Sequence, residues 1–275
     1  AELVGDFTSR FTFQVIAELA GVEPADLDRV ALWNEDNLAL MSPTFPLERK
    51  LAAAERMADY DAYVLDLIEQ RRSAPRDDIM SDLVHLEERT GEPPMDLPDL
   101  VGFWRGLFGA GIHTTKDAIG NTLYTLLEQR EHWESACANS AIIPDLLEES
   151  LRRDAPHRGL FRLTTEEVEL GGITLPPGSR LLLLFGSANR DESRFPEPDE
   201  FRPQRSNIGD HVAFGGGIHH CVGSQLARLE GQVALEALTD RLPDLRLAPG
   251  FVPRYSPTYF FRGLEHLDVV WTPRD

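Results

Sequence analysis

The chain is poor in cysteine, basic residues and long apolar runs. Its 275 residues include only Cys137 and Cys221, too few for a disulfide framework, which suits a reducing compartment such as the cytosol. Asp and Glu number 46 against 27 Lys and Arg, giving a formal net charge of −19 that argues against nucleic acid or an anionic membrane as a partner. No apolar stretch reaches transmembrane length, and residues 1–20 lack the charged start and apolar segment of a signal peptide.

The apolar residues that are present recur mostly at helical spacing. Over 160–185 they alternate instead, and Gly171-Gly172 and Pro176-Pro177-Gly178 mark tight turns between two or three short strands. Several helices are predicted within 1–90, including one over 52–72. Further helices are predicted over 96–128, from Pro144 over a short stretch, and over 225–242, where one face carries Leu226, Leu229, Val233 and Ala237. A further strand pair is predicted over 254–271. The pattern predicts a mainly α fold with small β-sheets (α+β).

The helix predicted over 96–128 has Asp96 as its N-cap and contains interior glycines. Each interior glycine costs about 0.5–1 kcal/mol relative to alanine, so their number requires a reason. Close packing of another helix is one reason, and close approach of a ligand at a local opening of the helix is another. The glycines are Gly106, Gly109, Gly111 and Gly120.

One cysteine ends a glycine-rich run directly before the helix predicted from 225. The run is Phe214-Gly215-Gly216-Gly217-Ile218-His219-His220-Cys221-Val222-Gly223. Glycines let the backbone turn and approach a flat partner closely, and the N-terminus of a helix favours a thiolate over a thiol. Such a thiolate can bind a metal or attack an electrophile. Burial as a small hydrophobic residue is an alternative, and so is a zinc site with His211, His219 and His220, although no paired ligand spacing completes a tetrahedral set.

The run resembles the haem-binding loop of the cytochrome P450 family, Phe-Gly-x-Gly-x-His-x-Cys-x-Gly. The matching residues are Phe214, Gly215, Gly217, His219, Cys221 and Gly223. The resemblance implies that Cys221 is the proximal thiolate ligand of the iron of haem b, a ligation that favours O–O cleavage. In the family His219 lies near a haem propionate and Phe214 packs beside the sulfur. The implied fold is one cytochrome P450-like domain over 1–275, of the soluble bacterial type and without the family's N-terminal segment.

Glu149 and Arg152 lie three residues apart on the short helix after Pro144, and so share a face. Exposed ion pairs, including Glu148–Arg152 and Glu149–Arg153 at four-residue spacing, are the alternative interpretation. Glu149-x-x-Arg152 resembles the family's Glu-x-x-Arg pair, which is buried and is completed by an arginine from a later loop. Glu200 occupies the usual position of that arginine, so Arg202 or Arg205 would have to serve.

Three further segments resemble functional parts of the family. Thr114, in Ala110-Gly111-Ile112-His113-Thr114-Thr115, matches the threonine that delivers protons to bound dioxygen, while His113 replaces the family's acid. A histidine can relay protons; use of peroxide, another reaction, or a His113 that points into solvent are the alternatives. Arg162 resembles the arginine that pairs with a haem propionate. Positions that line the substrate cavity in the family are occupied by Phe108, Gly109, Leu160, Phe161, Tyr259 and Phe260.

The resemblance implies a cytoplasmic haem-thiolate monooxygenase that oxidises an apolar small organic molecule. Electrons would come from a ferredoxin or flavodoxin-type partner, because the chain contains no flavin or nucleotide motif. A non-catalytic helper or binding module with this fold, a peroxide-using enzyme and a small zinc protein are the alternatives.

Overall fold

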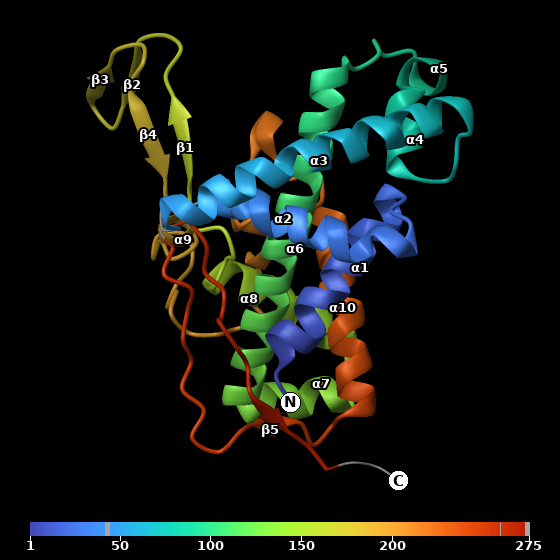
Figure 1. Ribbon diagram of the computed structural model, residues 1–275. Helices are drawn as coiled ribbons and strands as arrows, with labels where there is room; N and C mark the ends of the chain where they lie inside the picture. Colours follow the sequence, from blue (N-terminus) through green and yellow to red (C-terminus); the bar gives the residue numbers. More distant parts are fainter. Residues whose placement is uncertain (42–44, 259, 273–275) are drawn as a thin grey trace. The chain divides into compact units, whose positions relative to one another are not determined.

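Helices make up most of the computed structural model, which describes residues 1–41, 45–258 and 260–272 (Figure 1). The predicted class, mainly α with small β-sheets, is confirmed. The chain divides into two compact units, and each is described by itself. The helical unit is Ser9–His113, and the mixed unit is Ala1–Thr8 with Thr114–Asp275. One domain over 1–275 stays a prediction.

The helical unit is built on two long helices that lie side by side (Figure 1). These are α2 (Leu27–Met41) and α3 (Leu47–Ser73). The ring of Trp33 on α2 stacks on the ring of Tyr60 on α3, with centroids 5.1 Å apart. The helix predicted over 52–72 corresponds to α3, and its apolar residues at helical spacing form a buried face: Met57, Tyr60, Val64, Leu67 and Ile68. The α-helices of this unit are α1 (Ser9–Ala20), α2 (Leu27–Met41), α3 (Leu47–Ser73), α4 (Ile79–Val84), α5 (Leu86–Thr90) and the first half of α6 (Leu97–Glu128). A short 3₁₀-helix, η2 (Pro24–Asp26), precedes α2.

Helix α6 begins and ends as the sequence predicts. The Asp96 carboxylate accepts a hydrogen bond from the Asp99 N–H at 2.9 Å, as an N-cap does. The helix is continuous from Leu97 to Glu128, so it has no local opening. Gly111 is explained by packing, because a Cβ there would lie 2.6 Å from Cδ1 of Ile16 in α1.

The mixed unit contains the remaining helices and three two-stranded antiparallel sheets. Gly171 and Gly172, with φ of +60° and +79°, form the tight turn between β2 (Val168–Leu170) and β3 (Ile173–Leu175) (Figure 1). Phe185 begins a short helix instead of ending a strand. The α-helices are α7 (Arg130–Ala138), α8 (Ile143–Arg153), α9 (Phe185–Ala188) and α10 (Ser224–Arg241), besides the second half of α6. The strands are β1 (Leu160–Leu163), β2 (Val168–Leu170), β3 (Ile173–Leu175), β4 (Arg180–Leu183), β5 (Arg246–Leu247) and β6 (Val269–Val270). Shorter turns of helix are the π-helix η1 (Val4–Thr8) and the 3₁₀-helices η3 (Ser140–Ile142), η4 (Ile208–Asp210) and η5 (Gly217–His219).

The strand pair predicted over 254–271 is only partly correct. In the sheets, β1 pairs with β4, β2 with β3, and β5 with β6. The partner of β6 therefore lies outside 254–271, and within that range a single bridge joins Tyr255 to Leu264.

The helix predicted over 225–242 is α10, but the apolar face noted in its sequence is not the buried one. Leu229 and Val233 are 58% and 45% exposed, whereas Gly231 and Leu235 are buried. A Cβ at Gly231 would lie 2.7 Å from Leu147 on α8, so the glycine lets the two helices approach closely and decides which side of α10 faces inward. Among the described residues, no helix combines the length and apolar character needed to cross a membrane.

Candidate functional site

The cysteine loop, defined as Phe214–Gly223, leads directly into α10. Gly215 and Gly217 have φ of +70° and +61°, in the left-handed region that side chains disfavour, which explains their place in the run. The Cys221 N–H donates to the Phe214 carbonyl oxygen at 2.9 Å and closes the loop. The position of Phe214 therefore fixes the backbone of Cys221.

The cysteine loop presents its sulfur together with apolar side chains. Cys221 is exposed and its thiol is free. On either side of it, Ile218 and Val222 are 97% and 93% exposed. An apolar, planar group bound through the sulfur would cover these side chains, and each square ångström of apolar surface removed from water contributes about 25 cal/mol. Cys221 is not the buried hydrophobic residue of the alternative interpretation, and the loop fits a haem group.

Glu149 and Arg152 form a fully buried ion pair on α8. Arg152 Nε and Nη2 donate to the two Glu149 carboxylate oxygens at 2.7 and 2.9 Å, and both side chains are 0% exposed. The exposed-pair interpretation is therefore wrong. Arg205 supplies the third member, since its Nε donates to Glu149 Oε1 at 2.9 Å. Arg202 contributes only its backbone N–H, at 2.8 Å, while its side chain pairs with Glu197 and Glu200.

The buried pair is linked to the chain just before the cysteine loop through Asn189. Arg152 Nη1 donates to the Asn189 carbonyl oxygen at 2.8 Å, and the Asn189 side-chain oxygen accepts the Val212 N–H at 2.7 Å. The four-residue pairs considered from the sequence do not form. Arg153 instead pairs with Asp154, and Glu148 pairs with Arg228 and His211.

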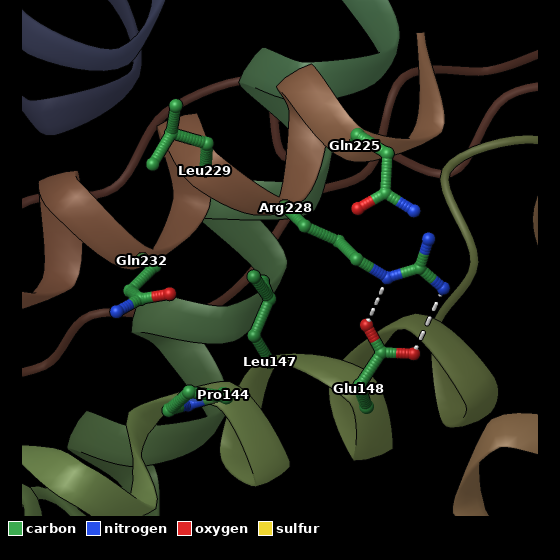
Figure 2. A pocket seen from close by; sticks show the side chains of 7 residues that line it. All are labelled: Pro144, Leu147, Glu148, Gln225, Arg228, Leu229 and Gln232. Carbon is green, nitrogen blue, oxygen red and sulfur yellow. Dashed lines mark hydrogen bonds and ion pairs between the residues drawn. The ribbon is translucent and has the colours of Figure 1, made fainter. Parts of the chain in front are cut away.

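A second charged cluster joins α8 to α10 beside a cavity of about 290 Å³ (Figure 2). Arg228 donates to both carboxylate oxygens of Glu148, and Nε2 of the buried His211 lies 2.9 Å from Glu148 Oε2. Burial alone would raise the pKa of Glu148, but the hydrogen bonds from His211 and Arg228 lower it to about 2. The described residues contain no group of three His, Cys, Asp or Glu side chains arranged to hold a metal ion, which counts against the zinc alternative.

The ring of His113 is half-buried and lies close to Asn34. The two side chains approach at 3.2 Å, between Nδ2 of Asn34 on α2 and Nε2 of His113 on α6. His113 therefore does not point freely into solvent, as one interpretation of the sequence had it. Thr114, the next residue of α6, is also half-buried. The sequence carries no signal for Asn34, because only the fold brings α2 to this part of α6.

The other predicted cofactor contacts lie on the mixed unit. His219 is exposed in the cysteine loop. Arg162 on β1 is half-exposed, and its Nη1 donates to the neighbouring Phe161 carbonyl oxygen at 2.9 Å. A Cβ at Gly223 would lie 3.9 Å from Cys221 Sγ, an ordinary van der Waals distance, so the sulfur does not by itself explain a glycine at this position.

The predicted substrate contacts fall in both units. Phe108 is fully buried in the helical unit, with its ring centroid 5.1 Å from that of Trp104. Gly109 follows it on α6. In the mixed unit Leu160 and Phe161 are exposed, and the rings of Phe161 and Phe260 meet edge to face at 5.5 Å. Tyr259 lies outside the described residues.

Comparison with known proteins identifies the family. Residues 33–242 match the family described as Cytochrome P450. A steroid C26-monooxygenase of Mycobacterium tuberculosis (strain CDC 1551 / Oshkosh) is 34% identical over 276 residues, which cover 99% of this chain and 73% of that protein. The mycinamicin IV hydroxylase/epoxidase of Micromonospora griseorubida is 37% identical over 98% of this chain and 67% of its own.

Solved structures give the same answer. The ligand-free structure of cytochrome P450 TbtJ1 superposes with a TM-score of 0.91 at 34% identity, covering 98% of this chain and 71% of that one. P450BioI, solved in complex with a fatty-acid-ligated acyl carrier protein, gives 0.90 at 31% identity, covering 99% and 69%. The chain belongs to the cytochrome P450 family of haem-iron monooxygenases, as the cysteine loop predicted.

Proposed function

We propose that the chain binds haem b through the sulfur of Cys221 and oxidises an apolar small organic molecule with dioxygen. The observation that carries this proposal is the cysteine loop, in which the backbone N–H of Cys221 bonds to the Phe214 carbonyl oxygen and the exposed sulfur lies between two exposed apolar residues of the sequence. When bound, haem supplies the oxygen chemistry, and a thiolate ligand favours O–O cleavage. The protein supplies the ligand, the anchoring charges and the route for protons.

The anchoring charges are assigned to Arg162 and His219. The guanidinium of Arg162 makes one hydrogen bond along its own strand, and its half-exposed fork suits a propionate carboxylate. His219 lies two residues before Cys221 in the same loop and is exposed, which supports a contact between its imidazole and a group bound to the sulfur. The positive φ angles of Gly215 and Gly217 shape the loop, and Gly223 ends it directly before α10.

Substrate, electron donor and location complete the proposal. The exposed Leu160 and Phe161, with Phe260 beside them, support an apolar substrate; Phe108 and Gly109 stay predicted substrate contacts. The sequence has no flavin or nucleotide motif, which supports a separate ferredoxin or flavodoxin-type donor. Two free thiols, Cys137 and Cys221, support a reducing, cytoplasmic location.

Thr114 and His113 are assigned to proton delivery. The Thr114 hydroxyl holds a proton at Oγ1, and the His113 imidazole or water replenishes it. Because consecutive side chains of a helix point about 100° apart, His113 acts through a relay and not by direct contact with Thr114. The hydrogen bond between Asn34 Nδ2 and His113 Nε2 supports this role, because it holds the imidazole ring in place.

The test of haem binding is the absorption spectrum of the purified full chain after reduction and addition of CO. A red-shifted Soret band supports the proposal. Haem-free protein that captures a partner protein supports the helper module instead, and a Soret band typical of an imidazole ligand excludes Cys221 as the ligand.

Replacing His113 by alanine is expected to lower the yield of oxidised product per electron pair by roughly a hundredfold, at the low end of what a positioned proton donor contributes. Hydrogen peroxide release should rise correspondingly. Product and peroxide are measured together, with His266→Ala as the matched control, because the half-exposed His266 lies between Phe251 and Asp268, on a segment remote in sequence from α6.

The unmodified protein separates the two enzymatic candidates. His113 in place of an acid favours peroxide use as the second candidate. If the enzyme uses peroxide, peroxide-driven turnover exceeds dioxygen-driven turnover already in the unmodified protein. An unchanged product yield in His113→Ala contradicts the proton-delivery role.

A further inference from the structure

The Glu148 cluster, defined as Glu148, His211 and Arg228, connects α8, α10 and the segment that enters the cysteine loop. Arg228 Nε lies 2.5 Å from Glu148 Oε1, and Nη2 lies 3.1 Å from Oε2, a two-point contact that fixes the plane of the guanidinium (Figure 2). On the other side, His211 Nε2 lies 2.9 Å from Oε2 of the same carboxylate. One carboxylate thus organises two cationic or proton-donating side chains.

Backbone contacts fix the direction of the His211 hydrogen bond. The Ala213 N–H donates to His211 Nδ1 at 3.2 Å, so Nδ1 acts as an acceptor and the proton lies on Nε2, directed at Glu148. His211 is buried, and its side chain is 1% exposed. The contact therefore ties residues 211–213 to α8.

Arg228 reaches the first residue of the cysteine loop. Its guanidinium carbon lies 4.5 Å from the centroid of the Phe214 ring, within the range of a cation–π contact. The Phe214 carbonyl oxygen in turn accepts the Cys221 N–H at 2.9 Å. An unbroken series of contacts leads from Glu148 through Arg228 and Phe214 to Cys221.

We infer that the Glu148 cluster positions the sulfur of Cys221 by holding Phe214 under the Arg228 guanidinium. Its role is distinct from that of the adjacent Glu149–Arg152 pair, which bonds the loop containing Arg205 and holds Val212 through Asn189. Glu148 and Glu149 are consecutive residues of α8, and each organises a different part of the segment before Cys221. The positioning of the cysteine loop does not depend on the proposed function. Its consequence for catalysis does, because that consequence requires Cys221 to be the haem ligand.

Hydrogen exchange tests the positioning directly. In Glu148→Gln, the purified full chain should exchange the Cys221 amide at least tenfold faster than the unmodified chain, because Arg228 is no longer oriented over Phe214. Mass spectrometry of peptides covering the cysteine loop and α7 gives the measurement. The matched control is Asp210→Asn, the same carboxylate-to-amide change at the residue before His211, where the ion pair with Arg194 is exposed.

Two outcomes overturn the inference. One is unchanged exchange at Cys221, and the other is an equal rise in the cysteine loop and in α7, which would mean that Glu148 only stabilises the fold. If Glu148→Gln does not fold, the Arg228→Lys variant tests the inference instead. Lysine keeps a positive charge for Glu148 but has no planar group to lie over the Phe214 ring. Loop-specific exchange must then rise in this variant, and unchanged exchange overturns the inference.

The haem spectrum separates this inference from the proposed function. In Glu148→Gln a fraction of the red-shifted Soret band of the reduced CO complex should be lost, while Asp210→Asn keeps the full band. An unmodified chain without any haem band contradicts the proposed function and leaves the exchange result standing. A full band in Glu148→Gln, together with unchanged exchange, contradicts the positioning role alone.

Discussion

Cys221→Ser is expected to abolish the red-shifted Soret band of the reduced, CO-treated protein and all product formation. In the proposed function the thiolate of Cys221 would set the electronic character of the iron, and a serine hydroxyl does not ionise near neutral pH to replace it. The matched control is Cys137→Ser. Cys137 lies half-buried on α7, 3.9 Å from the Pro243 carbonyl oxygen, and is remote in sequence from the cysteine loop.

The expected loss in Cys221→Ser is total, because the loop offers no equivalent sulfur. Cys137→Ser should retain the band at full height. A red-shifted band that persists in Cys221→Ser, or one lost only in Cys137→Ser, contradicts the assignment. The imidazoles of His219 and His220 lie next to Cys221 in sequence, so a variant that binds haem with an imidazole-type spectrum would be consistent with loss of the sulfur ligand.

Features set by neighbouring residues could be predicted from the sequence. The N-cap Asp96 and the buried face of α3 follow from local pattern, because helix geometry alone decides which side chains lie together. The cysteine loop is likewise a continuous run, and the φ angles of Gly215 and Gly217 explain why two of its positions require glycine.

Features set by packing between distant segments could not be predicted. The inward side of α10 depends on Gly231 meeting Leu147, a contact across more than eighty residues of sequence. The choice of Arg205 over Arg202 depends on the path of a loop that has no periodic pattern. The partners of Glu148 are invisible in the sequence for the same reason, since its apparent partner at helical spacing, Arg152, is bound to Glu149.

Glu148 and Glu149 show how a short helix can organise a site through two adjacent carboxylates. Successive side chains of a helix point in directions about 100° apart, so the two carboxylates reach different neighbours. Glu149 is buried with two arginines, and Glu148 is partly exposed with Arg228 and His211. Loss of the deeper pair should therefore affect folding, whereas loss of the shallower one should affect the cysteine loop.

Arg152→Ala is expected to lower the free energy of unfolding by about 3–5 kcal/mol, the range for breaking a buried ion pair from one side. The change leaves Glu149 buried with Arg205 as its only charged side-chain partner and removes the donors to the Asn189 and Pro198 carbonyl oxygens. Urea unfolding of the full chain, followed by circular dichroism, measures the loss. The matched control is Arg194→Ala, which removes an exposed ion pair with Asp210 and should change stability by about 1 kcal/mol or less. Equal midpoints for Arg152→Ala and Arg194→Ala would contradict a structural role for the buried pair.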